Sequence, residues 1–408
     1  MKFPRKPLFW SVAFGHAVND TFMSLGAVLL TFMKSRAILP IGTQEIGLAE
    51  TFRALVGSFS QPFFGWMVEK TGGRWLGAWG VAWTVGFMLL GIALAVATGS
   101  FWLMIIPYSL AALGSGAFHP VGALHAAESD KSRANINISW FFLCGQLGLA
   151  FGPLVTGFLL QQFNSVVPVF ALGLLVIPAV IWMALRIPSK EAYLHAAPEK
   201  SASKSAIDFS VLPWKALGLL LLVVTLRGIA QPGSGPFIPV LFEDKGWEPA
   251  SYGFIASMYW LASGLSGVWF SNLEDRFDRR YIVAASLALC APAFFFLPYV
   301  DGVWAVVLAI IGGGLSGGSH SIIVTAAQEL MPGSKAFASG AILGIIFGMG
   351  ALGSLLIGTV ASATSLTFAF GMIGVSALVA AASAFLLPRP HVKVEELSPS
   401  EELLEVGD

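Results

Sequence analysis

Charged residues are scarce in this chain. Asp, Glu, Lys and Arg make up 11% of its 408 residues, whereas a soluble domain carries about 25%. The hydrophobic fraction is 56% and the formal net charge is zero. No block of Lys and Arg occurs that would bind a nucleic-acid backbone. The composition therefore excludes an ordinary soluble domain and gives no reason to expect a nucleic-acid partner.

Cysteine is scarcer still, with two residues in the whole chain. Cys144 and Cys290 both fall within apolar stretches, so neither a disulfide framework nor a thiolate metal site is indicated. We expect no metal and no cofactor. No set of nucleophile, base and orienting group converges in the spacing, which argues against an enzyme. The N-terminus lacks the small-residue cleavage site of a signal peptide, so we interpret the first apolar stretch as part of the fold.

Long apolar runs dominate what the sequence does contain. A helix that crosses the hydrocarbon core of a membrane needs about 20 mostly apolar residues. The chain offers twelve such runs, separated by short polar breaks. We therefore predict an all-α membrane protein with twelve transmembrane helices, at residues 8–33, 44–68, 75–97, 101–127, 134–161, 166–187, 214–242, 249–272, 280–300, 303–330, 335–361 and 366–387.

One polar interruption is much longer than the others. Residues 188–213 are rich in Ser, Lys, Ala and Pro and have no helical apolar face, which is typical of a linker. The sequence thus divides into a six-helix bundle at 1–187, this linker, and a second six-helix bundle at 214–387. We expect the acidic tail at 388–408 to be disordered.

Basic residues indicate the orientation, because those near the ends of spans stay in the cytoplasm during insertion. With the N-terminus inside, only Lys34, Arg36 and Lys245 fall on the outer side, while Arg53 and Arg227 fall within spans. The other Lys and Arg residues face the cytoplasm. Both termini and the linker are then expected to be cytoplasmic.

The two predicted bundles carry related loops. The loop after the second span contains Gly65, Glu69 and Arg74, and the loop after the eighth contains Asp275 and Arg276. Glycine lets helices approach closely, and a carboxylate at such a turn can pair with a basic residue or a helix N-terminus of the other half. We expect these residues to act in conformational gating; the alternative is a generic charged turn. Two copies about half a chain apart indicate a parallel repeat, which is a transporter architecture.

The first span carries ionisable residues near the predicted membrane midplane. His16, Asn19 and Asp20 are spaced i, i+3 and i+4 and so share one helical face, and Asp20 lies about 18 Å along the helix. Arg53 and Arg227 fall at similar depth. A buried charge costs several kcal/mol and normally faces a partner or a water-filled cavity. We expect His16 and Asp20 to take part in proton coupling, and Asn19, Arg53 and Arg227 to bind substrate. A pair of Asp20 with Arg53 or Arg227 would be a switch or a permanent structural ion pair.

Two histidines occupy corresponding places in the fourth and tenth spans. His119 and His320 each follow a serine by one helical turn. Histidine titrates near neutral pH, so either ring can carry a coupled proton. Hydrogen bonding to substrate and a purely structural role are the alternatives. We interpret His125 as structural, and we expect Glu329, at the end of the tenth span, to act as a gate or to contact a helix end.

These residues resemble a known family. The two loops resemble the signature of the major facilitator superfamily. The segment from Gly148 to Gly152-Pro153 resembles a motif of its proton-coupled drug antiporters and is expected to act in gating, although packing of a kinked helix explains it equally well. Most of the chain resembles the fosmidomycin resistance family through Gly15-His16-Ala-Val-Asn19-Asp20, Gln61-Pro62-Phe-Phe-Gly65, Phe118-His119-Pro120 and Ala327-Gln328-Glu329-Leu-Met-Pro332-Gly333.

The resemblance implies two pseudo-symmetric six-helix bundles that export a small drug-like or anionic compound in exchange for protons, by alternating access. It also implies a location in the bacterial inner membrane, and we expect a monomer. Arg53 departs from the family pattern, so the identity of the substrate does not carry over. Import or uniport of an organic anion or a sugar is the alternative. A receptor or scaffold would need a folded soluble domain, which neither the linker nor the tail supplies.

Overall fold

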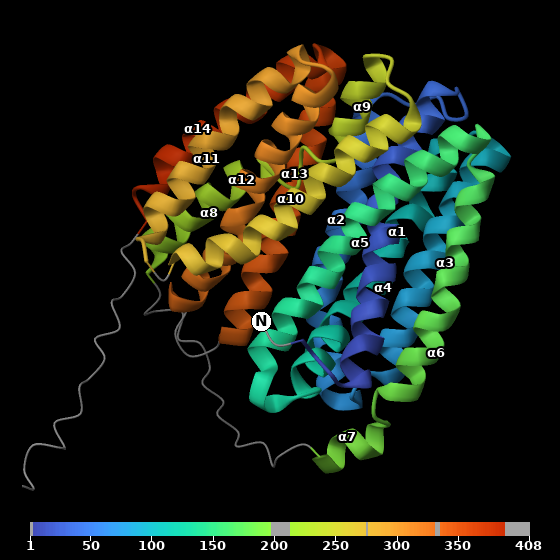
Figure 1. Cartoon of the computed structure of the whole chain (residues 1–408), viewed down its shortest axis with the longest axis vertical. Helices are drawn as coiled ribbons and strands as arrows, with labels where there is room; N and C mark the ends of the chain where they lie inside the picture. Colours follow the sequence, from blue (N-terminus) through green and yellow to red (C-terminus); the bar gives the residue numbers. More distant parts are fainter. Residues whose placement is uncertain (1–2, 197–212, 275, 331–334, 388–408) are drawn as a thin grey trace, which may run out of the picture.

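The computed structural model describes residues 3–196, 213–274, 276–330 and 335–387. Every regular element in these ranges is helical (Figure 1). The N-terminal half contains α1 (Pro7–Ser35), α2 (Thr43–Thr71), α3 (Arg74–Thr98), α4 (Phe101–Glu128), α5 (Ala134–Phe163), a 3₁₀ helix (Val167–Leu175) and α6 (Val176–Arg186). After α7 (Lys190–Ala196), the C-terminal half contains α8 (Trp214–Ala230), α9 (Phe237–Asp244), α10 (Pro249–Glu274), α11 (Arg279–Phe296), α12 (Gly302–Leu330), α13 (Lys335–Ala363) and α14 (Leu366–Ala384).

The predicted all-α fold with twelve spans is confirmed. Within the described ranges, eight helical segments are long and apolar enough to cross a membrane by themselves. The remaining four spans are α1, α2, α10 and the pair α8 and α9. Both α1 and α2 contain buried ionisable residues. In α1 and α2 the cost of burying these residues is offset by the partners that they find in the bundle.

The seventh span is not the continuous helix that we predicted at 214–242. Its first part, α8, ends at Ala230, and α9 begins only at Phe237. Pro232 and Pro236 lie in the interruption. Proline has no N–H to donate and its ring clashes with the preceding turn, so a helix does not run through this segment.

The two halves are related in how their helices pack. In the N-terminal half α1 packs along α5, and α2 along α4; in the C-terminal half the corresponding spans pair in the same way, α8 along α13 and α10 along α12. The halves meet along two seams, one between α2 and α13 and the other between α5 and α10 (Figure 1). A smaller contact joins α1 of the N-terminal half to α9 and α10 of the C-terminal half.

One end of the molecule, which we call the linker side, holds the start of α1 and the short helix α7 (Figure 1). The opposite end, the far side, holds α9. The sequence did not predict α7, which lies within the expected linker. Tyr193 of α7 lies against Gly72: a Cβ added to Gly72 would lie 2.7 Å from the Cβ of Tyr193. The rest of the predicted linker and the predicted tail lie outside the described residues.

The halves are joined on the far side. The Thr51 hydroxyl donates to the Ala351 carbonyl at 2.8 Å across the seam of α2 and α13. Across the seam of α5 and α10, the Ala250 N–H donates to Oε1 of Gln161 at 3.0 Å. Glycine permits this approach: a Cβ on Gly47 would lie 2.7 Å from the Ser354 carbonyl oxygen. The far side is therefore closed.

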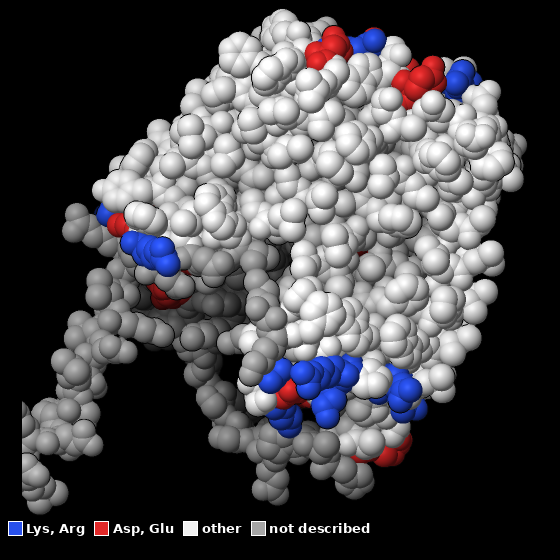
Figure 2. All heavy atoms as spheres, in the orientation of Figure 1, with Lys and Arg blue, Asp and Glu red and all other residues white. Residues whose placement is uncertain are grey.

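On the linker side the halves stand apart, and Figure 2 shows the surface hollowed between them. Apart from its chain neighbours and the nearby backbone of α2, no atom lies within 4 Å of the place where a Cβ on Gly65 would sit. Phe59 and Phe63, also on the linker-side part of α2, are 80% and 57% exposed. The conformation is open towards the linker side.

Charged side chains gather at the two ends of the molecule. Figure 2 shows Lys, Arg, Asp and Glu on the far side and on the linker side, with a broad uncharged band between them. Large apolar side chains are exposed in that band, among them Trp79, Trp83 and Leu90 of α3. Such a band is what the hydrocarbon core of a bilayer covers.

Candidate functional site

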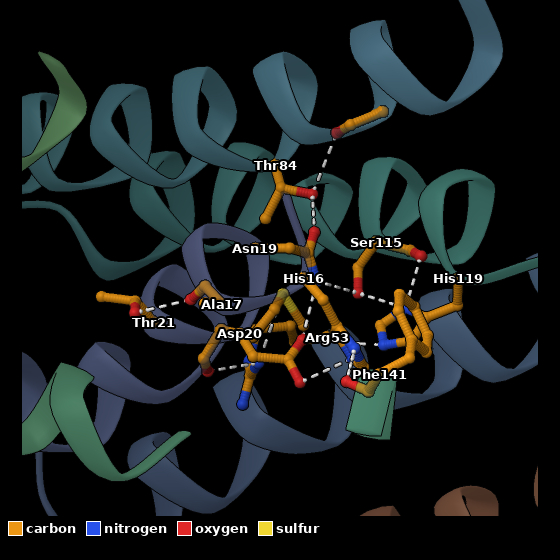
Figure 3. Close-up of polar contacts among 12 residues, drawn as sticks. His16, Ala17, Asn19, Asp20, Thr21, Arg53, Thr84, Ser115, His119 and Phe141 are labelled. Atoms are coloured by element: carbon orange, nitrogen blue, oxygen red, sulfur yellow. Dashed lines mark hydrogen bonds and ion pairs between the residues drawn. The ribbon is translucent and has the colours of Figure 1, made fainter. Parts of the chain in front are cut away.

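The polar face predicted on α1 is buried in the middle of the N-terminal half. His16, Asn19 and Asp20 are 2%, 0% and 7% exposed. They face α3, α4 and α5: Asn19 bonds Thr84 of α3 and Ser115 of α4, and His16 bonds the Phe141 carbonyl of α5 (Figure 3). Because i, i+3 and i+4 lie above one another on a helix, one stripe of α1 delivers all three side chains to the same place.

Two histidines flank the carboxylate of Asp20. Nε2 of His16 lies 3.2 Å from Oδ2 of Asp20, and Nε2 of His119 lies 3.6 Å from Oδ1. The other nitrogen of each ring is used elsewhere: Nδ1 of His16 donates to the Phe141 carbonyl at 2.8 Å, and Nδ1 of His119 donates to the Ser115 carbonyl at 2.8 Å. The structure thus brings together three of the four residues predicted for proton coupling.

This geometry has a consequence for protonation. A neutral imidazole that donates through Nδ1 presents only a lone pair at Nε2. Lone pairs of His16 and His119 would then face the oxygens of Asp20, and all three groups would repel one another. A proton on one of the three groups turns this repulsion into a hydrogen bond, so the cluster has a built-in place for a proton.

The same donor set is one that could hold a metal ion. Ligand atoms of His16, Asp20 and His119 lie within 4.8 Å of one another. Two imidazoles and a carboxylate are common ligands of transition metals, and each ring already donates its second nitrogen to a carbonyl. The absence of a metal stays a prediction.

Asn19 holds the carboxylate in place. Its Nδ2 donates to Oδ1 of Asp20 at 2.9 Å and to Oγ of Ser115 at 3.0 Å. The Thr84 hydroxyl donates to its Oδ1 at 3.0 Å. All of the amide is engaged in this network (Figure 3), and the predicted role of Asn19 in substrate binding stays a prediction.

Sequence reasoning missed Gly145, which closes the site from α5. A Cβ at this position would lie 2.8 Å from Oδ2 of Asp20 and would overlap the ring of His16. The only signal in the sequence is that Gly145 precedes Gly148 and Gly152 at similar spacing. Gly148 lies against Ala17 of α1, and Gly152 against Thr21 of α1. The glycines of α5 therefore let α1 approach, as expected of helix packing.

The expected pair of Asp20 with Arg53 or Arg227 is not formed. Arg53 instead forms an ion pair with Glu50 one turn earlier on α2, and NH1 of Arg53 donates to the Met23 carbonyl at 2.7 Å. Glu50 also accepts a hydrogen bond from the Tyr108 hydroxyl. Glu50 is 4% exposed, and sequence reasoning missed it although it stands three residues before Arg53.

Arg227 is buried in the C-terminal half without a carboxylate beside it in the described part of the chain. Its Nε donates to Oγ of Ser319 at 2.8 Å, and NH2 donates to Oε1 of Gln231 at 3.1 Å and to the Gly317 carbonyl at 3.4 Å. Each of these acceptors is neutral. His320, next to Ser319, is half-buried. No described carboxylate therefore compensates this guanidinium in the protein interior.

The predicted gating residues are only partly placed. Nε of Arg74 donates to the Ile187 carbonyl at 2.6 Å, within its own half. Glu329 pairs with Arg279, also within its own half, and Arg276 is exposed. The side chains of Glu69 and Asp275 lie outside the described residues. Pro153 lies on the seam of α5 and α10. A Cβ on Gly253 of α10 would lie 2.5 Å from the Pro153 carbonyl oxygen.

An ion-pair cluster on the far side was not predicted. Nζ of Lys34, at the end of α1, lies 2.7 Å from Oε2 of Glu243 and 2.6 Å from Oδ1 of Asp244, at the end of α9. We call these three residues the far-side latch. It joins the two halves at the end where they are closed.

The two packed bundles and the buried polar clusters are those of a helical membrane transporter. A family model described as "Major Facilitator Superfamily" matches residues 10–225 and 220–406, and the chain belongs to this family. It is 25% identical to the "Fosmidomycin resistance protein" of Escherichia coli (strain K12) over 384 residues, which cover 93% of each chain. It is 30% identical to the "Uncharacterized MFS-type transporter YfnC" of Bacillus subtilis (strain 168), over 94% of this chain and 93% of the relative.

Solved structures show the same fold. A nucleoside transporter, NupG, matches with a TM-score of 0.74 at 16% identity, over 93% of this chain and 99% of its own. A D-xylose-proton symporter matches with a TM-score of 0.75 at 12% identity, over 93% of this chain and 97% of its own. The predicted superfamily fold is thereby confirmed.

Proposed function

We propose that this transporter exports a small anionic or drug-like compound from the bacterial cytoplasm in exchange for protons. The relative named fosmidomycin resistance protein supports export of a drug-like molecule, since the match extends over nearly the whole of both chains. The observation that carries proton coupling is the place of Asp20 between the Nε2 atoms of His16 and His119.

The cluster couples a proton to a change of shape in the following way. With a proton shared between Asp20 and His119, the hydrogen bond between them holds α1 against α4, while Nδ1 of His16 bonds the Phe141 carbonyl of α5. When the proton leaves, lone pairs of both rings face the carboxylate and the contact becomes repulsive. The side chain of His119 is 27% exposed and that of His16 is 2% exposed, so His119 is the exit for the proton towards the open linker side. Release of the proton thus favours movement of α1 relative to α4.

Arg227 is the proposed anchor for an anionic substrate. No carboxylate in the described residues neutralises it, since its partners there are neutral, and it lies beside His320, which we propose hydrogen-bonds the substrate. Arg53 is the weaker candidate, since Glu50 already neutralises it. The N-terminal half then carries the proton site and the C-terminal half carries the anion site. Rocking of the halves opens both sites first to one side of the membrane and then to the other.

The proton gradient supplies enough free energy for this exchange. One proton that enters down roughly 150 mV releases about 3.5 kcal/mol, at about 2.3 kcal/mol per 100 mV. Since about 1.4 kcal/mol corresponds to a tenfold ratio, one proton per turnover sustains a substrate gradient of a few hundredfold. Export against a steep gradient is therefore feasible with one coupled proton.

The test is proton flux in proteoliposomes under an imposed pH gradient, with fosmidomycin and a panel of small anions added in turn. Asp20→Asn should abolish substrate-dependent proton flux, while Asp301→Asn, which removes an exposed carboxylate on the far side, should leave it intact. Protons that move opposite to the substrate support export. Protons that move with the substrate would establish import by symport instead, and flux that survives in Asp20→Asn would remove Asp20 from the mechanism.

The anion site is tested separately in the same vesicles. Arg227→Gln should abolish transport of anionic compounds, because the positive charge that offsets the substrate's desolvation is lost. A neutral compound that the protein carries should be much less affected. Unchanged anion transport in Arg227→Gln would contradict the proposed anchor without touching the proton site.

A further inference from the structure

The residues before α1 are held against the bundle by aromatic packing. The ring of Phe3 stacks on Trp10 of α1 with 5.4 Å between centroids, and it contacts Trp140 of α5 at 4.6 Å. Nε1 of Trp10 donates to the Pro4 carbonyl at 3.1 Å. Arg5 and Lys6 follow directly, so these two cations have a defined place on the linker side.

A pocket of about 350 Å³ lies beside this segment. Its walls come from two parts of the chain that are far apart in sequence, the segment before α1 and the connection between α4 and α5. The lining residues are Pro4, Arg5, Lys6, Ser129, Asp130, Arg133 and Asn137. Asn137 is 2% exposed and donates to Oγ of Ser129 at 3.0 Å, which gives the pocket a fixed polar floor.

The pocket carries an excess of positive charge. It has three cations, Arg5, Lys6 and Arg133, against one carboxylate, Asp130. Oδ1 of Asp130 accepts from the Ser132 hydroxyl at 2.6 Å, and this hydrogen bond lowers the pKa of Asp130. In the described part of the chain none of the three cations forms a direct ion pair. Figure 2 shows Lys and Arg gathered at this end of the N-terminal half.

We propose that this pocket binds the phosphate of an anionic phospholipid head group. Guanidinium and ammonium groups are the usual partners of phosphate oxygens. Basic pockets at the cytoplasmic end of transmembrane helices bind anionic head groups, and Trp10 and Trp140 are residues of the type that settles at the membrane–water interface. Free inorganic phosphate offers the same charged oxygens, but only a lipid also uses the apolar flank, where Phe3 is 56% exposed.

Native mass spectrometry of the delipidated, full-length protein in detergent tests this proposal, with phosphatidylglycerol and phosphatidylcholine titrated separately. The test variant combines Arg5→Gln, Lys6→Gln and Arg133→Gln. The matched control combines Arg186→Gln, Lys190→Gln and Lys215→Gln, which remove the same charge from the same side of the molecule. The single variant Arg133→Gln provides a second measurement should the triple variant fail to fold.

We expect the wild-type protein and the control to prefer phosphatidylglycerol. Affinity for this lipid should fall about fivefold in Arg133→Gln and about a hundredfold in the triple test variant, since each cation near an anionic head group contributes about 1 kcal/mol. An equal loss in the control would overturn the proposal, because the effect would then be general surface charge. Displacement of the lipid by millimolar inorganic phosphate would also overturn it, and would assign the pocket to soluble anions.

Discussion

Nε2 of His16 lies 3.2 Å from the carboxylate of Asp20, while Nδ1 of the same ring donates to the Phe141 carbonyl. The carbonyl therefore sets which nitrogen can share a proton with Asp20. His119 repeats this arrangement from α4 with the Ser115 carbonyl. Backbone atoms of two helices thus orient both rings towards one carboxylate of a third helix.

His119→Gln should reduce substrate-driven proton flux at least about tenfold. The reason is that this variant removes the imidazole of the cluster that is open to the linker side, and with it a group that can take up and release a proton. Proton flux in proteoliposomes over a pH series measures the effect. His125→Gln is the matched control on the same helix, since Nε2 of His125 bonds the Gly72 carbonyl away from the site. Equal losses in both variants would contradict a special role for His119.

Arg53→Gln should destabilise the protein by about 3 to 5 kcal/mol, because it leaves the buried carboxylate of Glu50 without its partner. The double variant Glu50→Gln with Arg53→Gln should recover most of this loss, since no uncompensated charge remains. Thermal unfolding in detergent of the wild type, both single variants and the double variant measures the cycle. A double variant as unstable as Arg53→Gln would contradict the structural pair. Normal anion binding by the double variant would contradict a role of Arg53 in binding the substrate.

Lys34→Gln should shift the population about fivefold towards a conformation that is open on the far side. The far-side latch is partly exposed, and an exposed ion pair contributes up to about 1 kcal/mol. Distances between spin labels at positions 35 and 248, measured by pulsed electron resonance, report the separation of the halves there. Lys245→Gln is the control, because Lys245 pairs at 3.0 Å with Asp301 of its own half. A distribution unchanged from wild type in Lys34→Gln would show that the latch does not hold the far side closed.

Gly145→Ala should abolish coupled transport while the protein still inserts and folds, because the added methyl group displaces the ring of His16 and the carboxylate of Asp20. Gly86→Ala is the matched control: apart from its chain neighbours and the nearby backbone of α3, no atom lies within 4 Å of the added carbon, and the change favours a helix. Proton flux and the unfolding temperature should be measured for both. Normal flux in Gly145→Ala would mean that α5 does not position the cluster.

The sequence alone determined the helices of this protein and the way they divide into two halves. Apolar runs of membrane length and the short polar breaks between them were sufficient, because the bilayer forces each span to satisfy its backbone within a helix. The exceptions were α7, which lies within the expected linker, and the seventh span, where Pro232 and Pro236 end the helix that the apolar run had suggested. The i, i+3 and i+4 spacing of His16, Asn19 and Asp20 likewise gave the polar face of α1 before any packing was known.

Which charges meet was decided only by the tertiary structure. Depth in the membrane made Asp20 and Arg53 plausible partners, yet Asp20 lies between two histidines and Arg53 pairs with Glu50. Nor did the sequence reveal the far-side latch, in which Lys34 is 209 and 210 positions away from its two carboxylates. Sequence spacing fixes the neighbours of a residue within one helix, whereas contacts between helices depend on how the bundles rotate and pack. Gly145 owes its importance entirely to that packing, because only the approach of α1 makes its missing side chain matter.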